Sequence, residues 1–249
     1  TIYFVGCPPY YDVLFSKLGV QGVEIARSAV RVLNHLGITP ILLADERCCG
    51  HDQLWEGEMD TFRRLAELNL ALLEEVVRET GAKRIVTTCP ECARTMAVDY
   101  PALVGSHGLE VLHLSQLLAQ RAADLQISKA ANWQTCTYHD PCRLGRFMGV
   151  YEEPRTVLKA LGVELVEMER HGKAALCCGT SCWTDCGAVS KAIQVDRLQE
   201  ARATGAEVLV TACPKCQIHF RCAQDDPHLG QELDIAITDL TVLVAQALG

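Results

Sequence analysis

The sequence predicts an α/β protein built from two tandem, pseudo-symmetric repeats, each with a parallel sheet. Three observations predict this class. Short β-prone runs alternate with amphipathic helices, the same order of cysteine motifs occurs twice, and single cysteines or cysteine pairs directly follow strands. Strands that alternate with helices are typical of a parallel sheet covered by helices. We therefore expect two Rossmann-like halves, residues 1–125 and residues 126–249.

Six short runs are expected to form strands, three in each half: residues 2–5, 40–43, 84–87, 135–138, 163–166 and 208–211. Apolar residues at helical spacing between these runs indicate amphipathic helices. One buried helix face is expected to consist of Phe62, Leu65, Leu68, Leu72 and Val76. In parallel sheets, ligands bind beyond the carboxyl ends of the strands, which is where Cys7, Cys89 and Cys213 stand.

The repeat is clearest at an offset of 124 residues. Residues 80–92 and 204–216 are identical at eight of thirteen positions, and they end in Cys89-Pro90-Glu91-Cys92 and Cys213-Pro214-Lys215-Cys216. Upstream, Cys48-Cys49-Gly50 corresponds to Cys177-Cys178-Gly179, and Cys7 corresponds to Cys142. The seam near residues 120–134 has no Pro/Gly/Ser-rich linker, so we expect the halves to pack together.

Composition limits the classes of function. The chain has 249 residues, 14 cysteines and a net charge of -8. A chain of this length needs no disulfide framework, and without a visible secretory signal clustered cysteines indicate metal binding or catalysis. The negative charge argues against nucleic-acid binding. Because no run of 18 apolar residues occurs, we expect a cytoplasmic location, with membrane association only through a partner or a missing segment. Because the sequence begins with Thr1 and not with Met, we expect it to be a piece of a longer polypeptide.

The cysteine pattern favours an iron–sulfur cluster in each half. Thiolates are soft ligands that suit iron–sulfur clusters, zinc and copper(I). Gly50 and Gly179 supply the backbone freedom that lets adjacent cysteines turn to one side. Five cysteines per half exceed the four of a tetrahedral zinc site. A structural zinc site in each half and a thioredoxin-like redox pair remain alternatives. The cysteine run of bacterial ferredoxins and a glycine-rich dinucleotide loop are both absent.

Taken together, these motifs resemble the cysteine-rich CCG domain of heterodisulfide reductase catalytic subunits and related iron–sulfur oxidoreductases. The resemblance covers nearly the whole chain and is carried by residues 3–7, 47–50, 88–92, 138–146, 176–179 and 212–216. It implies two noncubane [4Fe-4S] clusters, one in each half, that exchange single electrons with a disulfide or thiol substrate. The implied metal ligands are Cys7, Cys48, Cys49, Cys89, Cys92, Cys142, Cys177, Cys178, Cys213 and Cys216. Zinc stays an alternative for the first motif, whose spacing is longer.

The resemblance also implies partners: a ferredoxin-like iron–sulfur domain or subunit, and beyond it a flavoprotein or a membrane cytochrome or quinone-linked protein. Two other functions stay open. One is a pure electron-transfer module that connects a flavoprotein to a quinone-linked partner, and the other is a structural zinc-binding module for docking. No motif in the sequence names the physiological substrate.

A few residues outside the ten cysteines are candidates for function. His139 could donate a hydrogen bond to a cluster sulfide or a substrate thiolate, and Arg143 could offset the negative charge of a cluster; for each, an ordinary structural or surface role is an equal alternative. Cys136 and Cys222 are expected to be packing residues. Cys182 and Cys186 are four residues apart and would share a helix face, as extra ligands, a redox pair or buried apolar groups.

Overall fold

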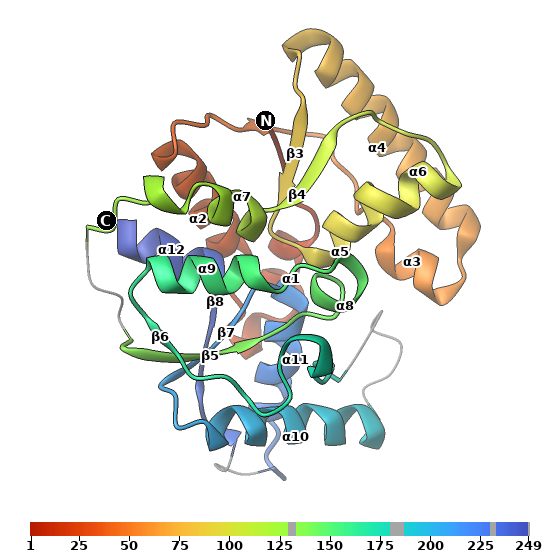
Figure 1. Ribbon diagram of the computed structural model, residues 1–249. Helices are drawn as coiled ribbons and strands as arrows, with labels where there is room; N and C mark the ends of the chain where they lie inside the picture. Colours follow the sequence, from red (N-terminus) through yellow and green to blue (C-terminus); the bar gives the residue numbers. More distant parts are fainter. Residues whose placement is uncertain (129–132, 180–186, 230–232, 249) are drawn as a thin grey trace.

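The computed structural model describes residues 1–128, 133–179, 187–229 and 233–248, which form two four-stranded parallel sheets. The strand orders are β2-β1-β3-β4 and β6-β5-β7-β8, so the second sheet repeats the first (Figure 1). The α/β class with two tandem Rossmann-like repeats is therefore confirmed. Among the described residues, no helix has the length and apolarity needed to cross a bilayer.

The first half contains β1 (Ile2–Phe4), α1 (Pro8–Leu14), η1 (Ser16–Leu18), α2 (Gly22–His35), β2 (Ile41–Leu42), α3 (His51–Glu56), α4 (Met59–Thr80), β3 (Arg84–Thr87), α5 (Pro90–Arg94), η2 (Thr95–Asp99), α6 (Tyr100–Leu103), β4 (Glu110–His113), α7 (Leu114–Gln120) and η3 (Ala122–Asp124). The second half contains β5 (Thr135–His139), α8 (Gly145–Met148), α9 (Glu152–Ala160), β6 (Glu164–Leu165), η4 (Gly172–Ala174), α10 (Ala188–Ala203), β7 (Val208–Thr211), α11 (Pro214–Gln224), β8 (Ala236–Asp239) and α12 (Leu240–Leu248).

All six expected strands are present, and the structure adds β4 and β8 at the outer edges of the two sheets. The central strands β1 and β7 are buried along their whole length, as is usual for a parallel sheet that helices cover on both faces. All neighbouring strands run parallel; Ile2, for example, pairs with both Ile41 and Ile85. The carboxyl ends of each sheet therefore meet at a single edge.

The expected buried face of α4 is partly wrong. Leu68 is 50% exposed, and the buried residues of the helix are instead Phe62, Ala66, Asn69 and Leu73. The difference arises because the buried stripe includes a small residue and an amide, which an apolar pattern does not select. Asn69 is buried because its side chain is used to hold the loop before Cys49, as described below.

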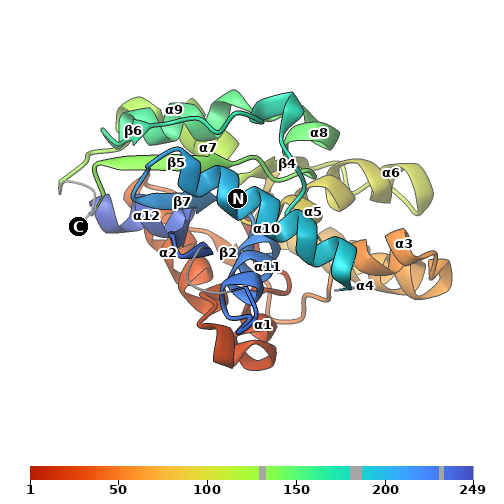
Figure 2. The same cartoon turned by 90° about the horizontal axis from the view of Figure 1, so that it is seen from below.

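The last helix of each half packs on the other half. α12 lies along α2, and α7 lies along α9 (Figures 1 and 2). A single core cluster accordingly joins residues of both halves, including Leu33 of α2 and Leu243 of α12. Each half also has a smaller core of its own under its cysteine loops. This reciprocal packing agrees with the expectation of halves packed together, while the boundary between residues 125 and 126 stays a prediction.

Candidate metal centres

Each half places five cysteines beyond the carboxyl ends of its strands. In the first half, Cys7 follows β1, Cys89 lies between β3 and α5 as the N-cap of that helix, and Cys48 and Cys49 lie in the loop between β2 and α3. In the second half, Cys142, Cys213 and the Cys177–Cys178 pair occupy the corresponding places after β5, β7 and β6. The repeated topology thus brings motifs that are distant in sequence to one edge of each sheet.

The cysteines of the first half form a connected set of thiols, here called the first thiol set. Hydrogen bonds between side chains link Cys7 to Cys48, Cys48 to Cys49, Cys49 to Cys92, and Cys92 to Cys89. The sulfur atoms of Cys49 and Cys92 are 3.4 Å apart. Cys49, Cys89 and Cys92 are buried, whereas Cys7 and Cys48 are half-buried. The set therefore extends from the core toward the surface.

The second thiol set has the same chain of contacts. Side-chain hydrogen bonds link Cys142 to Cys177, Cys177 to Cys178, Cys178 to Cys216, and Cys216 to Cys213. Again the outer members, Cys142 and Cys177, are half-buried and the others are buried. The structure therefore brings together, in each half, the five cysteines that the sequence motifs grouped, and their role as metal ligands stays a prediction.

The charge balance of these thiols suits a bound metal centre. Hydrogen bonds from Cys49 and Cys7 lower the pKa of Cys48 to about 3, so one thiolate is stable in the first set. The contact with Cys48, together with burial, raises the pKa of Cys7 and Cys49, and the contacts with Cys49 and Cys89, together with burial, raise the pKa of Cys92. Several neighbouring thiolates in a buried place repel one another unless a cation neutralises them. The donor set therefore fits a metal-containing group that would supply positive charge.

The glycine after each cysteine pair has a conformation that other residues rarely adopt. Gly50 has a φ of 81° and Gly179 a φ of 101°. A Cβ atom on Gly50 would be 2.9 Å from the Phe62 ring, and one on Gly179 would be 2.6 Å from the Ser190 carbonyl oxygen. These glycines therefore allow the sharp turn and the close helix approach that bring adjacent cysteines into one set, as the sequence predicted.

Two supporting residues, Asn69 and Tyr100, were not predicted. The buried amide of Asn69 accepts a hydrogen bond from the Arg47 backbone N–H (2.9 Å) and donates to the carbonyl oxygens of Arg47 (3.2 Å) and Cys48 (3.1 Å). The Tyr100 hydroxyl donates to the Cys49 carbonyl oxygen at 3.0 Å. Together they hold the backbone on both sides of the first cysteine pair. A lone Asn in an amphipathic helix carries no sequence signal for this role.

Arg143 lies at the contact between the two halves. It is buried rather than being a solvated surface cation, since its exposed fraction is 6%. Its Nε donates to His51 Nε2 at 3.0 Å, and its guanidinium lies 3.7 Å from the centre of the Trp55 ring. Arg143 therefore contacts the helix that follows Cys48-Cys49-Gly50 of the other half.

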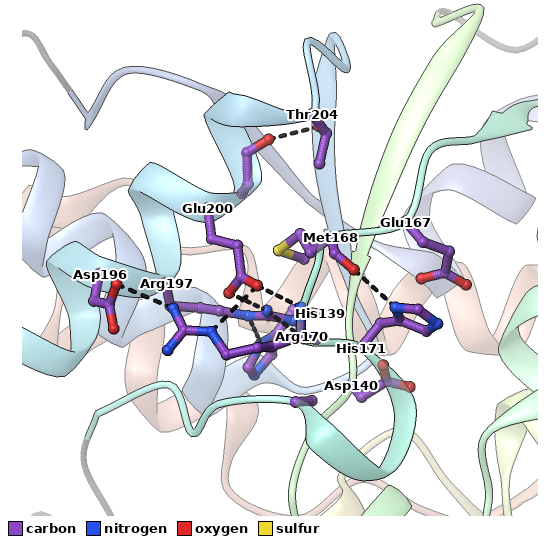
Figure 3. Close-up of polar contacts among 12 residues, drawn as sticks. His139, Asp140, Glu167, Met168, Arg170, His171, Asp196, Arg197, Glu200 and Thr204 are labelled. Atoms are coloured by element: carbon purple, nitrogen blue, oxygen red, sulfur yellow. Dashed lines mark hydrogen bonds and ion pairs between the residues drawn. The ribbon is translucent and has the colours of Figure 1, made fainter.

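His139 is fully buried at the end of β5, where Arg197 fixes its orientation (Figure 3). Arg197 Nε donates to His139 Nδ1 at 3.2 Å, while Glu200 accepts from Arg197 Nη1 at 2.7 Å. Burial, together with the charge of Arg197, lowers the pKa of His139 well below its usual range. The ring is therefore neutral, and because Nδ1 accepts, its proton lies on Nε2. Among the described residues, Nε2 has no hydrogen-bond partner.

The remaining cysteines differ in their surroundings. Cys136 is fully buried in the shared core, which confirms it as a packing residue. Cys222 is half-buried, with its sulfur 3.6 Å from Lys191 Nζ. Cys182 and Cys186 lie outside the described residues.

The fold and the two thiol sets define a tandem cysteine-rich domain with two candidate metal centres. The profile of the CCG cysteine-rich domain matches residues 1–97 and 136–221, and the chain belongs to this family. The relatives described next are named as reductases or oxidoreductases, or as subunits of them.

Several relatives are similar over most of the chain. One subunit of the dihydromethanophenazine:CoB–CoM heterodisulfide reductase of Methanosarcina barkeri is 35% identical over 100% of this chain and 59% of its own length. One subunit of the CoM/CoB fumarate reductase of Methanothermobacter marburgensis is 31% identical over 90% of this chain and 43% of its own. An EtfAB:quinone oxidoreductase of Syntrophomonas wolfei is 32% identical over 86% and 30%, respectively. The chain thus spans about three fifths, or less, of the length of these relatives.

Proposed function

We propose that each thiol set holds one [4Fe-4S] cluster of the noncubane type, and that the two clusters serve the reduction of a disulfide, one electron at a time. The observation that carries this proposal is the pair of equivalent five-thiol sets at the carboxyl edges of two equivalent sheets. The similarity of the whole chain to part of a heterodisulfide reductase supports the disulfide as the substrate class.

The spread of the sulfur atoms favours a cluster over a single zinc ion in both halves. In a tetrahedral zinc site with four thiolates, neighbouring sulfur atoms lie about 3.8 Å apart, because each Zn–S bond is about 2.3 Å. Within the described residues, the compact trio of metal-ligating atoms within 4.8 Å is His51, Asp52 and Glu91, and it contains no cysteine. The thiols are arranged instead as a chain of pairwise contacts, which suits a group with several metal atoms.

The chain's own residues would hold and insulate such a group. A bound cluster would supply one-electron redox chemistry. The three buried cysteines of each set exclude water from the inner side, whereas the half-buried pairs, Cys7 with Cys48 and Cys142 with Cys177, give a side from which a substrate or an electron donor can approach. We propose that the donor is a ferredoxin-like domain or subunit, with a flavoprotein or a quinone-linked protein as the next partner.

Metal analysis tests the cofactor. Anaerobically purified protein is expected to contain iron and acid-labile sulfide in near-equal amounts. The variants Cys49→Ala and Cys178→Ala are each expected to lose about half of the iron and one of two electron paramagnetic resonance signals. Cys136→Ala is the matched control, because this buried cysteine lies outside both sets and its loss should leave the iron content unchanged. Zinc without labile sulfide, or full iron retention in both variants, would falsify the cluster proposal.

A second assay tests the substrate class against the pure electron-transfer alternative. With an artificial low-potential donor, the protein is expected to reduce a mixed disulfide of two small thiols and to lose this activity in Cys178→Ala. If the clusters are reduced normally and pass electrons to a quinone analogue but never to a disulfide, the chain is an electron-transfer module without its own substrate.

A further inference from the structure

A chain of buried charges lies where the two halves meet. Lys215, from the motif Cys213-Pro214-Lys215-Cys216, is only 2% exposed. Its Nζ lies 2.6 Å from Asp52 Oδ1 and 2.8 Å from Glu91 Oε2. Glu91 belongs to the corresponding motif of the first half, Cys89-Pro90-Glu91-Cys92. The residue between Pro and the second Cys in one motif therefore contacts the residue at the same position in the other motif.

Arg143 lies beside this chain, next to the neutral ring of His51. Glu91 Oε1 lies 3.7 Å from His51 Nε2, which accepts a hydrogen bond from Arg143 Nε at 3.0 Å. Burial lowers the pKa of His51 to about 3, so the ring is neutral and can accept this bond. With Arg143 included, the charges alternate: the Arg143 cation, the Glu91 carboxylate, the Lys215 ammonium and the Asp52 carboxylate. Two positive and two negative charges therefore lie together, with the two cations buried and Asp52 half-buried.

This arrangement also explains why His51, Asp52 and Glu91 form a compact trio of potential metal ligands. The Lys215 ammonium lies within hydrogen-bonding distance of both carboxylates. It supplies the positive charge that a metal ion would otherwise bring. The trio is therefore part of an ion-pair network, and we assign it no metal.

We propose that Lys215 is a positioning residue that the second half supplies to the first: its ammonium, held by Asp52 and Glu91, favours added negative charge on the first thiol set and so raises the reduction potential of the centre bound there. This inference rests on the proposed function. The direction follows from Coulomb's law, because a reduced centre carries one more negative charge than an oxidised one. The Lys215 ammonium lies beside the first set because Glu91, which it contacts, stands between Cys89 and Cys92 of that set.

Because Lys215 and Glu91 have opposite charges, the proposal predicts that removing one or the other shifts the reduction potential of the first centre in opposite directions. Removing the cation in Lys215→Met leaves the Asp52 and Glu91 carboxylates without their partner beside the first set, so its centre should become harder to reduce. Removing one anion in Glu91→Gln should make the same centre easier to reduce. A purely structural role for the network predicts no such opposition, because breaking it from either side would disturb the packing in the same way.

The experiment is a redox titration followed by electron paramagnetic resonance on the full chain, with the first centre identified as the signal that Cys49→Ala removes. In Lys215→Met, the ratio of reduced first centre to reduced second centre is expected to fall about tenfold. This corresponds to a decrease of about 59 mV in the reduction potential of the first centre, for a one-electron couple. Glu91→Gln should shift it in the opposite direction, and Lys215→Arg should stay near the wild type.

Thermal unfolding of the metal-free variants reports whether each folds. Should Lys215→Met fail to fold, the pair Glu91→Gln and Asp52→Asn carries the test, since both are expected to raise the potential of the first centre. Equal shifts of one sign in Lys215→Met and Glu91→Gln, or unchanged potentials in folded variants, would overturn the proposal. A protein without iron would overturn the proposed function instead, so the two failures can be told apart.

Discussion

At the scale of single residues, His139 shows how an arginine can select the tautomer of a buried imidazole. Arg197 donates to Nδ1, which leaves the proton on Nε2, and among the described residues no protein atom accepts it. Hydrogen bonds from Cys142 and Cys178 lower the pKa of Cys177, and the His139 ring lies near enough to interact with that sulfur. We therefore expect the Nε2–H group to donate to the second thiol set or to the group that it binds.

Replacing His139 should affect the second centre alone. A hydrogen bond to a charged acceptor contributes roughly 1.5–3 kcal/mol. His139→Phe is expected to lower the reduction potential of the second centre and alter its electron paramagnetic resonance signal, whereas His139→Gln, which keeps an N–H donor, should retain more of both. The control is His107→Gln, a half-buried histidine of the first half. Identical spectra for wild type and His139→Phe would contradict a donor role.

Residue roles were predictable from the sequence where the chemistry is carried by a motif. The ten cysteines and both glycines occur in the same order in each half, and the structure brings them together. Lys215, Glu91 and Asn69 could not be assigned in this way, because their roles depend on contacts between segments far apart in the chain. Lys215, for example, contacts Asp52 across 163 positions. Arg143 could be named but not placed in the buried interface.

At the scale of elements, the two helices that cross to the other half begin differently. At the start of α7, the His113 side chain accepts from the Ser115 backbone N–H at 3.2 Å. At the start of α12, Asp239 accepts from the Thr241 backbone N–H at 2.7 Å. The strands before these helices, β4 and β8, were not predicted. Each has four residues at a sheet edge, and only parallel pairing with β3 or β7 reveals them.

The Asp239 cap should make stability depend on pH. Burial raises the pKa of Asp239 to about 7, against about 3.9 for Asp in an unfolded chain. Folding therefore favours the protonated carboxyl, and the stability that this provides is present at about pH 4 and is lost as pH rises through about 7. Burial likewise raises the pKa of Glu46 to about 7, so wild-type protein should be less stable at pH 8 than at pH 5.

Asp239→Asn should remove part of the stability loss that wild-type protein shows as pH rises. Relative to wild type, the free energy of unfolding of the variant is expected to rise by roughly 2–4 kcal/mol between pH 5 and pH 8. Urea unfolding at several pH values measures the difference. The exposed carboxylate of Asp234 offers the control, and Asp234→Asn should follow the wild-type pH dependence. If the free energy of unfolding depends on pH in the same way in wild type and Asp239→Asn, the Asp239 carboxyl has the same pKa in the folded and unfolded states.

At the scale of the whole molecule, the shared core should make the two halves unfold together. Leu243 of α12 is 1% exposed and belongs to the core cluster that contains α2 residues of the first half. Leu243→Ala is expected to cost about 2–5 kcal/mol of stability. Unfolding should remain a single transition, with tryptophan fluorescence and far-ultraviolet circular dichroism changing at the same denaturant concentration. Exposed Leu68→Ala serves as the control. Two separate transitions would mean that the halves are independent domains.

The reciprocal packing of the terminal helices also bears on how such a chain could arise. A single half-length gene product that dimerised through this contact would place its last helix on its partner, and its Cys-Pro-x-Cys motifs would meet at the twofold axis. In such a dimer, the side chain between Pro and the second Cys would face the same side chain of the partner, so a charged residue would meet a like charge. The Glu91–Lys215 ion pair requires two motifs that differ at this position. Duplication and fusion of the gene would therefore come before this pair in the history of the family, and the asymmetry between the two centres would be an acquisition of the fused protein.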